Sequence, residues 1–161
     1  MFLHSLSDLD KLKIQLEPVE ITQLLGEALQ ELTAGKHEVQ YEKTAFMAMV
    51  QADTKRFIQV LGNLVHNAEK YADTRITVYV EKEKESVRIH VRDYGTGIPD
   101  EDMPFIFDKF YRGRNCGEES GAGLGLFIVK YVLNQMGGEV QAVNTGNGLD
   151  VVLVMPMLEL P

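Results

Sequence analysis

Three glycines within five positions, Gly121, Gly123 and Gly125, precede an apolar run in the segment GAGLGLFIVK (121–130). Glycine is a poor helix former, so its use at the start of an expected helix needs a reason. A glycine-rich loop entering a helix offers unpaired backbone N–H donors at the positive end of the helix dipole, and these bind phosphate. No Gly-Lys-Ser/Thr of a Walker loop follows. The segment predicts a phosphate site of another kind, with a flexible turn before a core helix as the alternative.

Four polar side chains line one flank of a helix expected over about 54–70. At 100° per residue, Asn63, Asn67, Lys70 and Tyr71 lie beside its apolar stripe. An asparagine carbonyl oxygen is a suitable ligand for Mg²⁺, and a lysine one turn further on can contact a phosphate. A solvated flank would explain any one of these residues, whereas four in line favour a binding site.

The segment DYGTGIP (93–99) follows an expected strand. Asp93 at the strand end can accept a hydrogen bond from an exocyclic amine. Gly95 and Gly97 allow a close approach of the backbone to a ligand, although a plain β-turn explains this pattern equally well.

A cluster of aromatic and basic residues, FIFDKFYRGRN, occupies 105–115. We expect Phe107 and Phe110 to contribute to the core. Arg112 and Arg114 precede a loop rich in glycine, glutamate and serine, and cations on such a loop suit a lid over anionic phosphate.

Composition limits the possible functions. The 161 residues are 45% hydrophobic and 25% charged, which is ordinary for one globular domain. The formal net charge of −8 argues against nucleic-acid binding, which needs a basic surface. A single cysteine, Cys116, excludes an intrachain disulfide and fits a reducing compartment. No apolar run approaches the roughly 20 residues that span a bilayer.

Hydrophobic periodicity places these motifs on elements of both kinds. Helices are expected over 21–34, over 54–70 with Asp53 as N-cap, and from the glycine-rich segment to about Met136; strands are expected over 37–43, 45–52, 75–83 and 85–93, followed by a hairpin over 138–156 that turns at Gly146–Gly148. This order predicts an α+β fold, a two-layer α/β sandwich in which about three helices cover one face of a mixed, mostly antiparallel sheet.

In this order, the four stretches resemble the catalytic ATP-binding domain of sensor histidine kinases, within the Bergerat-fold ATPase superfamily. QVLGNLVHNAEKY (59–71) resembles the family's N box, and DYGTGI (93–98) resembles its G1 box. IFDKFYR (106–112) resembles the F box, and GAGLGL (121–126) resembles the G2 box. The resemblance covers about residues 18–156, and four motifs in register are specific. It departs from the family at Leu149, where a threonine usually follows the last glycine motif.

The resemblance implies a role for each matching position. Asn67 would hold Mg²⁺, Lys70 and either Arg112 or Arg114 would contact phosphate, and Asp93 would bind the adenine amino group. Catalytic roles would belong to Asn67, Lys70 and Arg112. The ATP site as a whole would comprise Asn63, Asn67, Lys70, Tyr71, Asp93, Gly95, Gly97, Ile98, Phe110, Arg112, Arg114, Gly121, Gly123, Leu124, Gly125 and Leu126.

The residue one turn before Asn67 distinguishes a kinase from a hydrolase. ATP-hydrolysing relatives carry a glutamate there as general base, whereas this chain has Asn63, and an amide cannot take a proton from water at neutral pH. The resemblance therefore implies transfer of the γ-phosphate to a histidine. Because His37-Glu38 leads into an expected strand, we expect the acceptor outside this chain, with 1–16 as the end of a dimerisation helix and 17–161 as the ATP domain.

The implied partners are the dimerisation and phosphoacceptor domain of the same protein and, indirectly, a response regulator receiver domain. The full-length protein is expected to be a homodimer, and this domain to be cytoplasmic, which is compatible with a membrane-anchored sensor. Two alternatives stay open: a serine protein kinase of the same fold, of the anti-sigma type, and a degenerate module that binds nucleotide as a switch or not at all.

Overall fold

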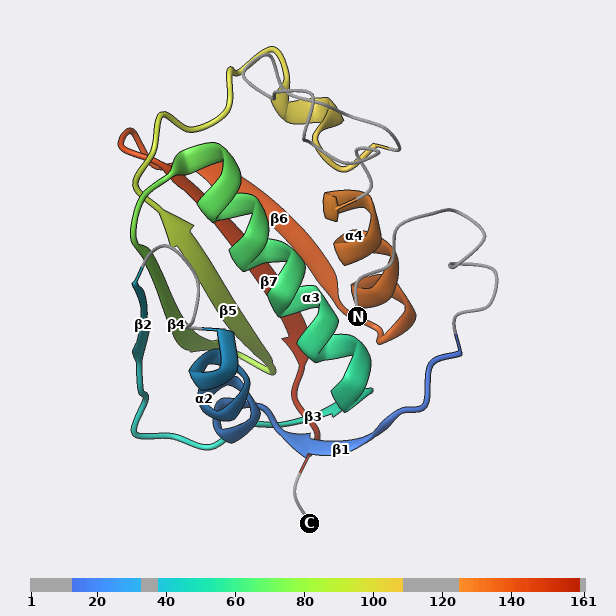
Figure 1. Cartoon of the computed structure of the whole chain (residues 1–161). Coiled ribbons are helices and arrows are strands. Elements are labelled where there is room, and N and C mark those ends of the chain that lie inside the picture. The colour runs from blue at the N-terminus through green and yellow to red at the C-terminus, as the bar shows by residue number, and fades with distance from the viewer. Residues whose placement is uncertain (1–12, 33–37, 109–124, 160–161) are drawn as a thin grey trace.

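The computed structural model describes residues 13–32, 38–108 and 125–159 (Figure 1). The strands are β1 (Glu17–Glu20), β2 (Val39–Glu42), β3 (Met49–Ala52), β4 (Ile76–Glu83), β5 (Ser86–Asp93), β6 (Glu139–Asn144) and β7 (Leu149–Pro156). The helices are α2 (Ile21–Leu32), α3 (Thr54–Asn67) and α4 (Gly125–Gln135), with a π-helical turn at Ala68–Ala72 and a 3₁₀ turn at Met103–Phe105.

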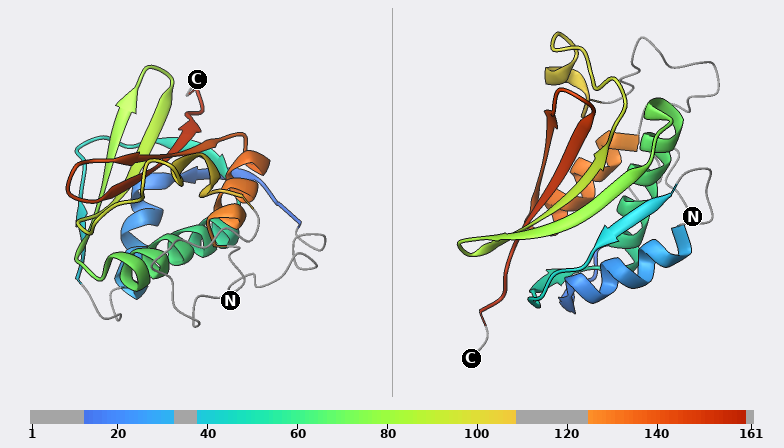
Figure 2. Two further views of the ribbon diagram at one scale, coloured as in Figure 1. Left: turned by 90° about the horizontal axis from the view of Figure 1, so that it is seen from above. Right: turned by 90° about the vertical axis from the view of Figure 1, so that its left-hand side faces the viewer.

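Five strands form the main sheet in the order β2-β4-β5-β7-β6. β2 runs parallel to β4, and the other neighbours are antiparallel. The helices α2, α3 and α4 lie together on one face of this sheet (Figure 2). The expected α+β sandwich, with a mixed and mostly antiparallel sheet under three helices, is confirmed.

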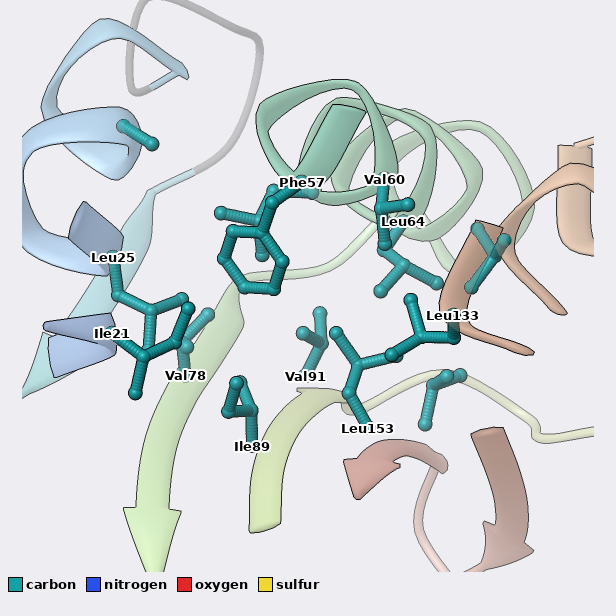
Figure 3. Close-up of a cluster of buried hydrophobic side chains, with 14 of the residues drawn as sticks. Ile21, Leu25, Phe57, Val60, Leu64, Val78, Ile89, Val91, Leu133 and Leu153 are labelled. Atoms are coloured by element: carbon teal, nitrogen blue, oxygen red, sulfur yellow. The ribbon is translucent and has the colours of Figure 1, made fainter. Parts of the chain in front are cut away.

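The core lies between the sheet and these helices. Alternation of apolar residues correctly predicted the inward faces of β4 and β5, because Val78, Ile89 and Val91 are buried there. Phe57, at 0% exposure on α3, points toward these strands (Figure 3). This packing fixes α3 above the centre of the sheet, so its two ends have fixed positions for a site.

Asp53 begins α3, as its residue type and position predict. One carboxylate oxygen accepts a hydrogen bond from the Arg56 N–H at 3.1 Å, which satisfies a donor of the first helical turn. The other oxygen accepts one from the Gln15 N–H at 2.8 Å. A single buried side chain therefore ties the segment before β1 to the start of α3.

Several expected elements differ in detail. The regular α-helix ends at Asn67 rather than near 70. The strands expected over 37–43 and 45–52 do not pair with each other, since β2 joins β4 and β3 forms a separate antiparallel sheet with β1. β1 was not expected, because it has only four residues and contains Pro18, which an edge strand tolerates.

Other expectations fall on residues that the structure does not describe. The leucine stripe in residues 1–12 and most of the His37 segment lie outside the described residues. Within the described ranges, no helix has both the length and the apolar character that crossing a bilayer requires.

Candidate functional site

The end of α3 meets the beginning of α4. A Cβ placed on Gly125, the first residue of α4, would lie 3.1 Å from Asn67 Nδ2 and 3.2 Å from Asn67 Oδ1. The two helices run side by side (Figure 1), so the contact joins two segments far apart in sequence. The carboxamide and the start of the glycine-preceded helix are thereby brought together, as the motifs predict.

The predicted site residues before and after Asn67 differ in burial and in the kind of helix that carries them. Asn63, one turn earlier, is buried at 7% exposure. After Asn67 the chain widens into the π-helical turn, which ends where the Asp73 N–H donates to the Ala68 carbonyl at 3.1 Å. Lys70 is half-buried within this turn. The 100° spacing used for Lys70 and Tyr71 was therefore wrong, because a π turn changes the angle between successive side chains.

Asp93 ends β5 as a buried carboxylate, with 9% exposure. Its Oδ1 accepts hydrogen bonds from the Gly95 N–H at 3.1 Å and the Leu149 N–H at 3.0 Å. Burial raises the pKa of Asp93, the two N–H donors lower it, and the nearby charge of Asp150 raises it again. Both N–H groups donate to Oδ1, and among the described residues no hydrogen bond to Oδ2 is seen. Oδ2 can therefore accept a hydrogen bond from a ligand.

The loop after Asp93 is fixed by close contacts. A Cβ on Gly95 would lie 2.8 Å from Ala72 Cβ, so this glycine abuts the π turn. Asn144 at the end of β6 accepts a hydrogen bond from the Ile98 N–H at 2.9 Å, and its Nδ2 donates to the Ile98 carbonyl at 2.6 Å. A Cβ on Gly97 would lie 2.6 Å from Asn144 Oδ1. The sequence analysis missed Asn144; its position just before the Gly146–Gly148 turn was the available signal.

Several predicted site residues cannot be placed. Outside the described residues lie Phe110, Arg112, Arg114, Gly121, Gly123 and Leu124, and nothing is described of the Tyr71 side chain. Leu126 is partly buried and packs against the core. Phe107 is half-buried rather than a full core residue, with the Lys130 ammonium 6.0 Å from its ring centre.

The described groups suit a ligand that combines anionic and hydrogen-bond-donating parts. The start of α4 attracts anions, and the Asp93 carboxylate accepts donors. The described residues hold no cluster of three or more His, Cys, Asp or Glu side chains that could bind a metal. A metal at Asn67 would have few protein ligands, which fits Mg²⁺ because Mg²⁺ keeps waters and ligand phosphates in its shell.

Comparisons with known proteins identify a family and several relatives. A family profile described as histidine kinase-, DNA gyrase B- and HSP90-like ATPase matches residues 52–159. The chain is 28% identical over 136 residues to the signal transduction histidine-protein kinase/phosphatase MprB of Mycobacterium leprae, covering 83% of this chain and 26% of that protein. It is 33% identical over 144 residues to the sensor protein KdpD of Clostridium acetobutylicum, covering 86% of this chain and 16% of that protein. The chain therefore spans only a minor part of these relatives.

Solved structures of similar shape are also known. A mycobacterial sensor histidine kinase MprB matches with a TM-score of 0.77 at 24% identity, over 89% of this chain and 100% of that one. Full-length ShkA in complex with AMPPNP matches with a TM-score of 0.77 at 25% identity, over 92% and 32%. Each of these likenesses covers 89% or more of this chain.

Proposed function

The chain belongs to the family of histidine kinase-, DNA gyrase B- and HSP90-like ATPases, as a catalytic ATP-binding domain of the histidine kinase type, and we propose that it holds Mg–ATP between the end of α3 and the start of α4. From there it donates the γ-phosphoryl group to a histidine on a dimerisation domain outside residues 17–161. The observation that carries this proposal is the contact between Asn67 and Gly125, because it joins a metal-binding amide to a phosphate-binding helix start.

Each part of the nucleotide has a partner in this proposal. Asp93 accepts a hydrogen bond from the adenine amine at Oδ2, while Gly95, Gly97 and Ile98 shape the loop beside the base. Asn67 holds Mg²⁺ through its amide oxygen, and Lys70 contacts phosphate. The remaining phosphate contacts fall to Arg112 or Arg114 and to the backbone of Gly121, Gly123 and Leu124, with Phe110, Tyr71 and Leu126 lining the site.

Phosphoryl transfer requires positioning more than covalent chemistry from this domain. Bound Mg²⁺ would neutralise charge on the phosphates. An imidazole nitrogen of the acceptor histidine forms a bond to the γ-phosphorus, the bond from that phosphorus to the β–γ bridging oxygen breaks, and ADP leaves. Asn63 cannot serve as a base for water, which keeps hydrolysis slow and favours transfer.

The partners follow from the same proposal. In this proposal residues 1–16 belong to the dimerisation and phosphoacceptor domain, the whole protein is a homodimer, and a response regulator receiver domain takes the phosphoryl group from the histidine. The domain works in the cytoplasm. One matched relative is named a signal transduction histidine-protein kinase/phosphatase and the other a sensor protein, so nothing favours the serine-kinase or degenerate alternatives.

Nucleotide titration tests this function. A non-hydrolysable ATP analogue should bind saturably, in the micromolar-to-millimolar range, and more tightly with Mg²⁺ than with a chelator. Asn67→Ala, which removes the amide oxygen, should remove most of the Mg²⁺ dependence and abolish phosphotransfer to an added acceptor domain while the circular dichroism spectrum is retained. Absence of saturable binding by the wild-type chain would reject the proposal.

A further inference from the structure

A cluster of polar and aromatic side chains around His90 lies on the sheet face opposite α2, α3 and α4. His90 of β5 and Asp150 of β7 are both 7% exposed, and their Nδ1 and Oδ2 atoms are 2.8 Å apart. Glu81 Oε1 lies 2.6 Å from His90 Nε2, but the angle at the nitrogen does not allow a hydrogen bond. The Tyr79 ring stacks on the imidazole, with 4.3 Å between the ring centres. β4, β5 and β7 are thus joined through one histidine.

The residue next to Asp150 reaches the candidate nucleotide site. Side chains alternate along a strand, so Asp150 and Leu149 point to opposite faces of the sheet. The Leu149 N–H donates to Asp93 Oδ1 at 3.0 Å. The pairing of β5 with β7 ends at Arg92 and Asp150, so Leu149 lies just beyond the last paired residues. Leu149 also pairs with Asn144 of β6, so its position beside Asp93 depends on the β6–β7 hairpin together with what holds Asp150.

The carboxylate of Asp150 depends on His90 for compensation. Its Oδ1 is buried and has no hydrogen-bond partner, while Oδ2 is bonded to the imidazole. Removing one partner of a buried pair leaves the other without compensation, and the local structure then shifts toward solvent. A shift of Asp150 carries Leu149 with it and loosens the bond that holds the Asp93 carboxylate.

We propose that His90 and Asp150 form a positioning pair, which acts through Leu149 to hold Asp93 in the orientation that recognises the adenine amine. The inference rests on the proposed function of the Asp93 site. His90 is a positioning residue rather than a catalytic one, since its side chain lies on the opposite face of the sheet from that site.

The affinity ratio of ATP to inosine triphosphate measures this role. Inosine triphosphate keeps the triphosphate but has a carbonyl oxygen in place of the exocyclic amine and an N1–H in place of the N1 acceptor. The ratio therefore reports recognition of this edge of the base, where Asp93 is the proposed partner of the amine. We expect the wild-type chain to prefer Mg–ATP by at least about tenfold, the scale of a hydrogen bond to a charged group. His90→Leu should lower this preference by roughly tenfold, mainly by weakening ATP binding. His90→Asn, whose Nδ2 takes the place of Nδ1 as donor to Asp150, should restore it.

The outcomes separate the two proposals. An unchanged ratio in folded His90→Leu would overturn the positioning role, because a merely structural defect weakens both nucleotides equally. If the wild-type chain binds neither nucleotide or does not discriminate, the proposed function of the Asp93 site fails instead. The Leu149 amide resonance of the nucleotide-free chain then decides the local role: it should move in His90→Leu and stay near the wild-type position in His90→Asn. Should His90→Leu not fold, Asp150→Ala replaces it, with the same fall in ratio and the same amide shift expected.

Discussion

The carboxamide of Asn67 lies against the backbone of Gly125, at a distance where a side chain on Gly125 would press on it. A Cβ there would come 3.1 Å from Nδ2 and 3.2 Å from Oδ1, which is closer than ordinary van der Waals contact. The last residue of α3 and the first residue of α4 are therefore fitted to one another. The close contact explains why this helix begins with a glycine, although glycine lowers helix stability.

Gly125→Ala should weaken Mg–nucleotide binding while the fold survives. The added methyl group displaces only the end of the Asn67 side chain, which can turn away but then no longer presents its oxygen to the metal. We expect the dissociation constant to rise by about tenfold, the scale of one lost interaction with a charged group. Isothermal titration with Mg²⁺ and with a chelator measures the effect, which should be confined to the Mg²⁺ arm.

Gly26→Ala is the matched control for that substitution. Gly26 lies inside α2, and a Cβ there would meet the Tyr41 ring at 3.5 Å, an ordinary contact. Replacing a glycine in a helix interior should stabilise the fold by about 0.5–1 kcal/mol. Nucleotide affinity should stay at the wild-type value. Equal affinity losses in the two variants would remove the special role of the Gly125 contact.

Asp93→Asn should separate stability from binding. Burial raises the pKa of Asp93 above its ordinary value of 3.8. Between that pH and the higher pKa of the folded chain, the folded chain holds a proton that the unfolded chain has already lost. The contribution of Asp93 to the free energy of unfolding is therefore lost as the pH rises from 3.8 through the pKa of the folded chain. At neutral pH the buried, ionised carboxylate lowers stability. The asparagine oxygen can still accept from Gly95 and Leu149.

Urea unfolding of both chains at about pH 4 and about pH 7 checks this sign. The free energy of unfolding of Asp93→Asn relative to wild type should increase between the two pH values, while ATP affinity falls by at least about tenfold. Glu85→Gln removes one charge from an exposed position in the turn between β4 and β5 and should change neither quantity. A relative stability that instead declines toward neutral pH would contradict the burial argument.

Local patterns predicted several features of the elements that position the candidate site. Asp53 as N-cap, Phe57 in the core and the turn at Gly146–Gly148 follow from residue type and spacing alone. Periodicity failed where the geometry departs from it, as in the π turn that places Lys70. A π turn has no distinct sequence signal, because it depends on how the helix end packs.

Contacts between distant segments could not be predicted in the same way. The bonds from Asn144 to Ile98 and from Leu149 to Asp93 span 46 and 56 residues. These bonds depend on the register of β6 and β7 against β5. The alternation of apolar residues predicts which face of a strand is buried, but it does not predict which residues pair. Four motifs in register indicated that these segments meet, but not which side chains orient them.

Asp53→Ala should destabilise the fold more than Asp53→Ser. Alanine removes both the helix cap and the bond from Gln15, and loss of a cap alone costs about 1 kcal/mol. Serine keeps one oxygen for the Arg56 N–H but leaves the Gln15 N–H without its acceptor. Amide hydrogen exchange at Gln15 should therefore quicken in both variants, and at Arg56 only in Asp53→Ala. Slow exchange at Gln15 in either variant would show that β1 pairing, rather than Asp53, holds this segment.

Gly148→Ala should disrupt the nucleotide site and the hairpin together. Gly148 has a φ of +146°, and a Cβ there would lie 2.0 Å from the Asp93 carbonyl oxygen and 2.9 Å from Tyr94 Cα. Both neighbours are backbone atoms, so no side chain can turn aside, and β7 must move away from Asp93. Gly146→Ala is the control, since Gly146 has a φ of +90° but nothing within 4 Å of a Cβ, so it carries the backbone strain alone.

We expect Gly146→Ala to lose about 1–3 kcal/mol of stability and to keep its preference for ATP over inosine triphosphate. Gly148→Ala should lose more stability and, where it still folds, should bind the two nucleotides with nearly equal affinity. Thermal unfolding and the two titrations measure both effects. A Gly148→Ala chain with wild-type discrimination would mean that Asp93 keeps its orientation without the close packing of β7, and the link from the β6–β7 hairpin to the adenine contact would then be wrong.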